Sequence, residues 1–218
     1  MPGTLVFDVE TTGLPVRESM YRRFPDPKKY HAFDTARVVE LAYKVFDADN
    51  MLVKAVSVLV KPDRFEIENS DIHGIKHETA EQYGSRIDFV IANFLMDVDH
   101  CDTLVSHNME FDLNIMLSEI WRIVLAGEEE TQETEEEETK TERVHFNFLD
   151  VQTLVSANKF CTMKTAQKRL NLTKYPKLVD LYHTLCDRRA GWKQSHRALD
   201  DVDKCAQCYF KLVSTPYV

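Results

Sequence analysis

Residues 5–14 read Leu-Val-Phe-Asp-Val-Glu-Thr-Thr-Gly-Leu, and this stretch predicts how the chain begins to fold. It is rich in β-forming residues and ends at a Thr-Gly pair, so we interpret Leu5–Glu10 as a buried strand with a turn after it. Side chains alternate across a strand, which places Asp8 and Glu10 on one face and the apolar residues on the other. The sequence therefore predicts either two solvated acids on a strand edge or a cation site, because buried carboxylates are costly without a cation.

Asp112 is the next acid in an unusual setting. It falls in the first turn of a predicted helix, Phe111–Leu125, with Asn108 available as the cap. An acid there also favours the helix dipole, so a purely stabilising role stays open. Its neighbours along the helix are mostly apolar, however, and a carboxylate in a mostly buried helix needs a partner.

The last predicted helix, Ala198–Leu212, distinguishes two adjacent acids. Helical spacing places Asp200 on the polar face and Asp201 beside the buried stripe, so Asp201 is the better metal ligand. His196 is out of helical register with Asp201, and we expect it at the helix start, with Ser195 as a cap. A histidine beside a metal site is a candidate general base, although most lone histidines are incidental.

The remaining pattern predicts one α/β domain over residues 1–218 with a mixed sheet. Two segments are predicted to be loops: Arg17–Phe33, and a Glu-rich solvated insertion at about 127–142 that is too charged to bury. The further expected strands are Val38–Phe46, Met51–Lys61 after a turn at 47–50, Thr103–Ser106 and His145–Asp150, and the further expected helices are Asp88–Met96, Thr162–Leu170 and Leu178–Cys186.

Composition excludes several classes of protein. No apolar run approaches the length of a membrane span, and the N-terminal residues do not resemble a secretion signal. Five cysteines form an odd set without framework spacing, which indicates an intracellular, reducing compartment such as the cytoplasm or nucleus. Cys205 and Cys208 lack a second pair of ligands, so we interpret them as core or surface thiols rather than a redox or metal pair.

The net charge of -9 is concentrated in one segment. Residues 128–142 hold nine Glu and one Lys, so the rest of the chain is close to neutral. Within that remainder, residues 151–197 hold ten Lys or Arg against two Asp. This basic segment is either an ordinary solvated face or a surface that neutralises phosphates, and the acidic total therefore does not exclude nucleic acid.

Three motifs that contain these acids and the histidine follow one another along the chain. They are Phe-Asp-Val-Glu-Thr-Thr-Gly-Leu at 7–14, His-Asn-Met-Glu-Phe-Asp at 107–112 and His-Arg-Ala-Leu-Asp-Asp at 196–201. In this order the chain resembles the DnaQ-like 3′–5′ exonucleases of the DEDD superfamily. It resembles the histidine-containing (DEDDh) branch, because Arg197 stands where the tyrosine branch has Tyr. His73-Gly74-Ile75 is similar to the family's short segment near the terminal nucleotide.

The resemblance implies an RNase H-like fold, with a five-stranded mixed β-sheet flanked by α-helices and the acidic site at the end of the first strand. It implies that two Mg²⁺ or Mn²⁺ ions bind Asp8, Glu10, Asp112 and Asp201, and that His196 takes a proton from the attacking water. The product would be a nucleoside 5′-monophosphate from the 3′ end. The residues implied for holding the last nucleotide are Thr11, Thr12, Gly13 and Leu14, with Gly74, Ile75, Asn108 and Phe111 as secondary candidates.

DNA is the favoured substrate, because the Thr11–Leu14 spelling is similar to that of proofreading subunits and related DNA exonucleases. Oligoribonuclease relatives usually have Met in place of Thr11, and RNA trimming is the enzymatic alternative. No polymerase motifs accompany the domain, so proofreading would require a DNA polymerase or other replication protein as partner. A non-catalytic nucleic-acid-binding module of the same fold is the other alternative, and the presence of all five catalytic positions argues against it.

Overall fold

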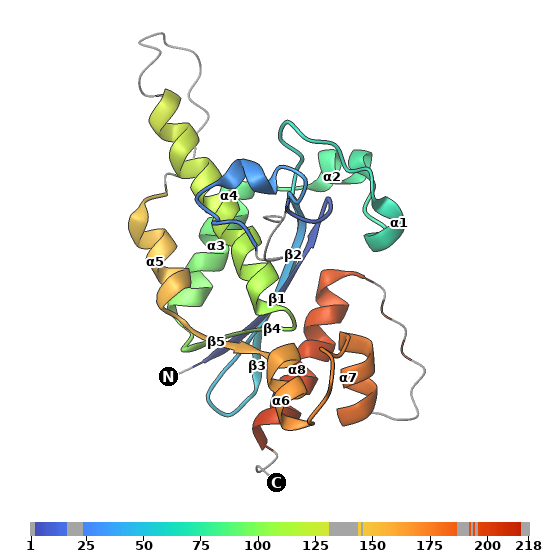
Figure 1. Ribbon diagram of the computed structural model, residues 1–218. Coiled ribbons are helices and arrows are strands. Elements are labelled where there is room, and N and C mark those ends of the chain that lie inside the picture. The colour runs from blue at the N-terminus through green and yellow to red at the C-terminus, as the bar shows by residue number, and fades with distance from the viewer. Residues whose placement is uncertain are drawn as a thin grey trace.

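A five-stranded mixed sheet organises the chain (Figure 1). The computed structural model describes residues 3–16, 24–130, 144, 146–186, 192, 194 and 196–214. The strand order is β3-β2-β1-β4-β5, with β1 antiparallel to β2 and parallel to β4. The strands are β1 Thr4–Thr11, β2 Val38–Phe46, β3 Leu52–Leu59, β4 Thr103–Ser106 and β5 Asn158–Cys161. The predicted α/β class and mixed five-stranded sheet are confirmed.

Helices cover both faces of this sheet. The 3-10 helix η1 is Tyr30–Phe33, and the α-helices are α1 Ser70–His73, α2 His77–Tyr83, α3 Ile87–Asp99, α4 Met109–Glu130, α5 Phe148–Ser156, α6 Thr162–Arg169, α7 Leu178–Leu185 and α8 Ala198–Ser214. One apolar cluster joins the sheet to α3, α4 and α5, and a second joins it to α6, α7 and α8. None of the helices in the described part of the chain combines the length and apolar character that a membrane crossing requires.

The central strand β1 divides its side chains between these two clusters. Leu5 and Phe7 are fully buried against α3 and α4, whereas Val6 packs with α8 on the other face. Alternation continues the row of Val6 through Asp8 and Glu10, as predicted. Packing of the apolar row therefore fixes which face of the sheet carries the two acids.

The turn between β2 and β3 follows from its acidic and amide side chains. Asp47 accepts hydrogen bonds from the backbone amides of Asp49 and Met51, both at 2.9 Å. Asn50 has a φ of 62°, a left-handed conformation that asparagine tolerates better than most residues. The predicted turn at 47–50 is confirmed.

The predicted strand at His145–Asp150 is wrong. Asn147 and Asp150 form a reciprocal capping box, and the helix α5 begins at Phe148. The amide of Leu149 donates to the Asn147 side chain at 2.7 Å, and the Asn147 amide donates to Asp150 at 2.7 Å. These bonds satisfy two backbone donors at the start of the helix. The fifth strand is instead Asn158–Cys161, which is short and half polar; residue 145 lies outside the described residues.

Two predicted loops contain helical turns. Within Arg17–Phe33, η1 occupies Tyr30–Phe33, and residues 17–23 lie outside the described part. Helix α4 continues to Glu130, four residues into the predicted insertion at 127–142. Glutamate has a high helix propensity, so the helix extends into the start of the acidic run. Residues 131–142 are not among those described.

Candidate active site

Motifs from the start, middle and end of the chain meet in one open pocket of about 170 Å³ near the end of β1. Four acids and a histidine predicted as catalytic line it together. The lining residues are Asp8, Val9, Glu10, His107, Asn108, Phe111, Asp112, Leu178, Gln194, His196 and Asp201. The structure therefore brings together all five predicted catalytic positions, from β1, α4, α8 and the segment before α8.

Helix starts position two of these acids. Asp112 lies in the first turn of α4 and Asp201 in the first turn of α8, and both side chains are buried. Asp200, in contrast, accepts a 2.9 Å hydrogen bond from the Trp192 indole and does not line the pocket. Helical phase thus distinguishes the two neighbouring acids as the sequence predicted.

Burial raises the pKa of each of the four acids, and repulsion from neighbouring carboxylates adds to this effect. Burial raises the pKa of Asp8 well above its usual value, and the charges of Asp112 and Glu10 raise it further. Burial, followed by the charge of Asp201, raises the pKa of Glu10 to about 8. Burial likewise raises the pKa of Asp112 to about 7 and that of Asp201 to about 6. The protein alone thus disfavours the charged form of every acid in the pocket.

The pocket also contains carboxylate oxygens that lack hydrogen-bond partners. Within the described part of the chain, neither Asp112 Oδ2 nor Asp201 Oδ1 is satisfied, although both atoms are buried. Gln194 Nε2 donates to the other oxygen of Asp201. Ligand atoms of Glu10, His196 and Asp201 lie within 4.8 Å of one another. Clustered carboxylate oxygens suit a hard divalent cation such as Mg²⁺ or Mn²⁺, so the residues present fit the predicted metal.

Comparison with known proteins identifies the family of this chain. The model of the RNase T exonuclease family matches residues 5–209. The chain belongs to this family. A comparison with curated protein sequences found no significant match.

Solved structures show the fold of this family member. A crystal structure of E. coli Exonuclease I with a dT13 oligonucleotide aligns with a TM-score of 0.62 and 15% identity, covering 99% of this chain and 41% of that chain. Exonuclease I from Methylocaldum szegediense aligns with a TM-score of 0.59 and 16% identity, covering 98% of this chain and 40% of that one. The chain thus spans about two fifths of the length of these proteins, and it shares their RNase H-like fold.

His196, the predicted base of this exonuclease-family site, has an unusual backbone. Its φ is 51°, in the left-handed region that residues other than glycine rarely adopt. It stands two residues before α8 with an exposed side chain, and Ser195, its predicted neighbouring cap, lies outside the described residues. Strained backbone of this kind persists only where surrounding contacts hold it in place.

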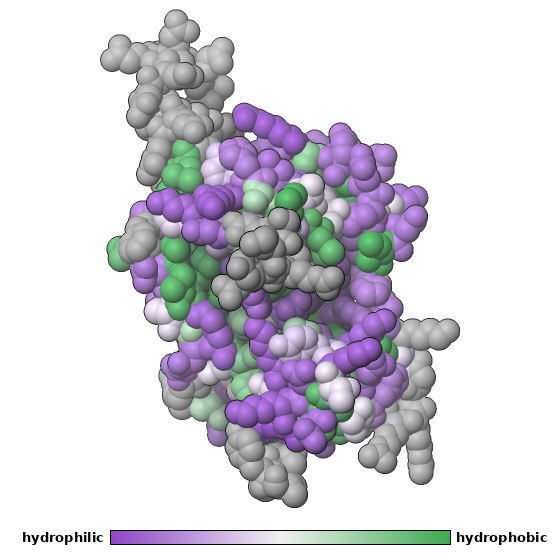
Figure 2. Space-filling model, viewed as in Figure 1, coloured by the Kyte–Doolittle hydropathy of each residue, from purple (hydrophilic) through white to green (hydrophobic). Residues whose placement is uncertain are grey.

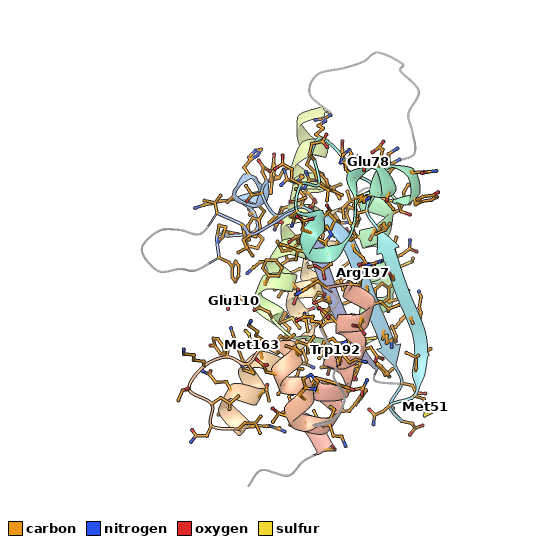
Figure 3. The ribbon with its side chains drawn as sticks, turned by 90° about the vertical axis from the view of Figure 1, so that its right-hand side faces the viewer. Met51, Glu78, Glu110, Met163, Trp192 and Arg197 are labelled. Carbon is orange, nitrogen blue, oxygen red and sulfur yellow. The ribbon has the colours of Figure 1, made fainter. Side chains whose placement is uncertain are left out.

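Glu40 is a buried acid beside the site that the sequence analysis did not identify. It lies on β2 directly opposite Glu10, and only 1% of it is exposed. Arg197 donates to both of its oxygens at 2.9 and 3.1 Å, Ser57 donates at 2.8 Å, and the Ala198 amide donates at 3.2 Å. Burial raises the pKa of Glu40, but the hydrogen bonds from Arg197 and Ser57 outweigh it and leave that pKa lowered. Glu40 thus holds the residues that immediately follow His196, and Figure 3 shows Arg197 at the start of α8 beside the strands.

A signal for Glu40 was present in the sequence. Among the residues Val-Val-Glu-Leu-Ala-Tyr of β2 it is the lone acid in an apolar run. A charged residue on a buried strand needs a partner of opposite charge. That partner is Arg197 of the third motif. No comparable signal marked Gln194 or Leu178, because their contacts depend on the tertiary fold.

One group of the predicted nucleotide-binding residues lines the pocket, and the other group does not. Asn108 and Phe111 line the pocket. Leu14 is 66% exposed, and it follows a loop whose Thr11 and Thr12 side chains bond to the backbone of Gly13 and Arg37. A Cβ on Gly13 would lie 2.8 Å from the carbonyl oxygen of Thr35, so the turn requires glycine.

The segment of α1 is held beside this loop. The Asn69 side chain donates to the Thr11 carbonyl at 3.0 Å, and Gly74 ends α1 with a φ of 72°. Ile75, however, is only 3% exposed and packs with Val39 and Ala80. Its side chain therefore belongs to a small apolar cluster rather than to the pocket surface.

Proposed function

We propose that this chain is a metal-dependent 3′–5′ exonuclease that releases nucleoside 5′-monophosphates from the 3′ end of single-stranded or frayed DNA. The observation that carries the proposal is the gathering of four buried or half-buried acids with raised pKa values around one pocket. Such a cluster destabilises the fold unless cations neutralise it. Membership of an exonuclease family supports the same reaction.

Asp8, Glu10, Asp112 and Asp201 would hold two divalent ions. When bound there, Mg²⁺ or Mn²⁺ would supply water activation and neutralise charge on the phosphate. The unsatisfied oxygens of Asp112 and Asp201 are the available ligand atoms that support this assignment.

His196 would act as the general base. It lines the pocket, and one of its ring nitrogens lies within 4.8 Å of the ligand oxygens of Glu10 and Asp201. Its side chain is exposed at the mouth of the pocket, so it can accept a proton from water and pass it to solvent. Phe111 and Asn108 would orient the terminal nucleotide from within the pocket, and Leu14 would pack on its base from the loop after β1.

DNA as the substrate is supported by relatives of the same fold. E. coli Exonuclease I has been solved in complex with dT13 and with dA16 oligonucleotides. We extend this substrate class to the present chain. The sequence Thr11–Leu14, which is similar to that of DNA exonucleases, supports the same substrate. A polymerase partner in proofreading and a reducing intracellular compartment are part of the proposal on sequence grounds alone.

Product analysis tests the proposal. A 5′-labelled DNA 20-mer incubated with Mn²⁺ should shorten one nucleotide at a time from its 3′ end. In ¹⁸O-water the isotope should enter the released 5′-monophosphate, because water attacks phosphorus and the P–O3′ bond breaks. A matched RNA strand run in parallel should be trimmed more slowly.

Variants of two neighbouring acids provide the control. Asp201→Asn should abolish release, whereas Asp200→Asn should retain it, because only Asp201 lines the pocket. His196→Ala should slow release by about 10²–10⁴-fold, the usual contribution of a general base. No shortening by the wild-type protein, or equal rates for the Asp200 and Asp201 variants, would refute the proposal.

A further inference from the structure

A second charged surface lies next to the acidic pocket, and the reaction described above does not use it. From Asn158 to Val179 the chain has six Lys or Arg residues and no acid. This stretch forms β5, α6, the loop after α6 and the start of α7. Figure 2 shows mostly hydrophilic side chains on the lower part of that face, where Figure 1 places α6 and α7.

His107 holds this basic stretch against the pocket. It lines the pocket, its Nδ1 lies 2.9 Å from Thr162 Oγ1, and its Nε2 lies 3.1 Å from the Pro176 carbonyl oxygen. Burial lowers the pKa of His107 to about 4, so the ring is neutral at pH 7. A carbonyl only accepts, so Nε2 carries the hydrogen and Nδ1 accepts from the Thr162 hydroxyl. One side chain therefore fixes both the start of α6 and the following loop beside the acids.

Three exposed lysines of this stretch are available to a ligand. Lys164 pairs with Glu110 at 2.7 Å, and Figure 3 shows Glu110 and Met163 on the same side of the molecule. Lys168, Lys174 and Lys177 are exposed, and none of them has an acidic partner among the residues that the structure describes.

An exposed aromatic residue lies among these cations. Tyr175 stands between Lys174 and Lys177 in sequence and is 53% exposed. It is close enough to Lys164 to contribute to that lysine's raised pKa, after Glu110 and Cys161. Cations interleaved with an aromatic ring are the usual composition of a surface that binds single strands.

We propose that the lysine face, defined as Lys168, Lys174 and Lys177 with Tyr175, binds the single strand on the 5′ side of its terminal nucleotide. The lysines would neutralise backbone phosphates and Tyr175 would stack on a base. This inference rests on the proposed function, because the acids of the pocket mark where the 3′ end lies. A single strand fits better than a duplex, since paired bases do not present their faces to a side chain.

The salt dependence of binding gives the expected size of the effect. Each phosphate neutralised on a single strand contributes about 0.7 to the slope of log K against log salt. Replacing Lys168, Lys174 and Lys177 by alanine should therefore lower the slope by about 2. If the wild-type protein and the variant bind equally at about 1 M salt, the variant should bind about 100-fold more weakly than the wild type at about 0.1 M salt. Tyr175→Ala should weaken binding by about 5- to 150-fold with little change of slope.

The binding experiment uses a fluorescein-labelled dT20 strand and anisotropy in EDTA, which prevents cleavage. Lys61→Ala is the matched control, because Lys61 is an exposed lysine that pairs with Glu81 of α2 at 3.1 Å. Helix α2 lies far from α6 in both Figure 1 and Figure 3. Wild-type affinity and slope in the triple variant, or an equal loss in Lys61→Ala, would overturn the inference.

A small substrate separates this inference from the proposed function. The 4-nitrophenyl ester of thymidine 5′-monophosphate has no chain to reach the lysine face. The triple variant should hydrolyse it at the wild-type rate with Mn²⁺ and show a raised KM only for dT20. An equal loss on both substrates would overturn the lysine face. No hydrolysis by the wild-type protein would refute the proposed function, while anisotropy would still test the lysine face.

Discussion

Replacing Glu40 tests whether contacts behind the pocket set the position of His196. Glu40 does not line the pocket, but it accepts four hydrogen bonds from Arg197, Ser57 and the Ala198 amide. The two residues that follow His196 are therefore fixed to β2 by one carboxylate. Glu40→Gln keeps the size of the side chain and removes its charge.

The magnitude follows from the donors that glutamine cannot serve. Its remaining oxygen can take the place of Oε2 and keep the bonds from Arg197 Nε and Ala198, while its amide nitrogen donates to Ser57. The bond from Arg197 Nη2 is lost, and a hydrogen bond to a charged group is worth about 1.5–3 kcal/mol. Water reaches Arg197, whose side chain is 50% exposed, so we expect a loss of about 2 kcal/mol in the free energy of unfolding.

Urea denaturation and steady-state kinetics measure the two consequences. We expect kcat to fall about 10- to 100-fold with little change of KM, because a misplaced base loses part of its 10²–10⁴-fold contribution. The double variant Glu40→Gln/His196→Ala should be no slower than His196→Ala alone. If Glu40→Gln matches the wild type in stability and kcat, or if the two losses multiply in the double variant, Glu40 does not act through His196.

Three further predictions concern stability and substrate binding. Glu119→Gln should reduce the free energy of unfolding by about 3–5 kcal/mol, because Arg37 stays buried without its charged partner at 2.8 Å. As a control in the same urea assay, Glu110→Gln breaks an exposed pair with Lys164 and should change the free energy of unfolding by less than about 1 kcal/mol. In EDTA, Tm should fall as pH rises from about 4 to about 8, because the folded state binds extra protons on Glu10 and Asp201, whose pKa values are about 8 and 6. Mn²⁺ should reverse that fall. A Tm that rises between pH 6 and 8 without metal would contradict the raised pKa values of the acids in the pocket. Leu14→Ala should raise KM for DNA and leave Tm unchanged, because Leu14 is 66% exposed; an unchanged KM would remove Leu14 from the substrate site.

Local patterns sufficed where one interaction dominates. Alternation in β1 predicted the face of Asp8 and Glu10, and helical phase in α8 distinguished Asp201 from Asp200. The fifth strand was misplaced because β5 is held by pairing with β4 rather than by its own composition.

The supporting contacts of the site depend on residues far apart in the chain. Glu40 and Arg197 are separated by 157 positions, and His107 and Pro176 by 69. No local periodicity connects such pairs. The acids of the pocket were therefore predictable from their motifs, whereas the residues that hold the neighbouring segments in place were not.

Asp112→Asn tests the central claim most directly, since it removes one carboxylate from the pocket and one of the proposed metal ligands. Asp112 is 3% exposed, and its Oδ2 has no hydrogen-bond partner among the described residues. Tm with EDTA and with Mn²⁺ at pH 8 would be measured beside nucleotide release from the 3′ end. We predict a Tm in EDTA no lower than that of the wild type, a smaller rise with Mn²⁺, and release slowed by about 10³-fold, corresponding to several kcal/mol of lost charge stabilisation. A variant that keeps both the Mn²⁺-dependent rise and the release of nucleotides would contradict a metal-dependent nuclease site in this pocket.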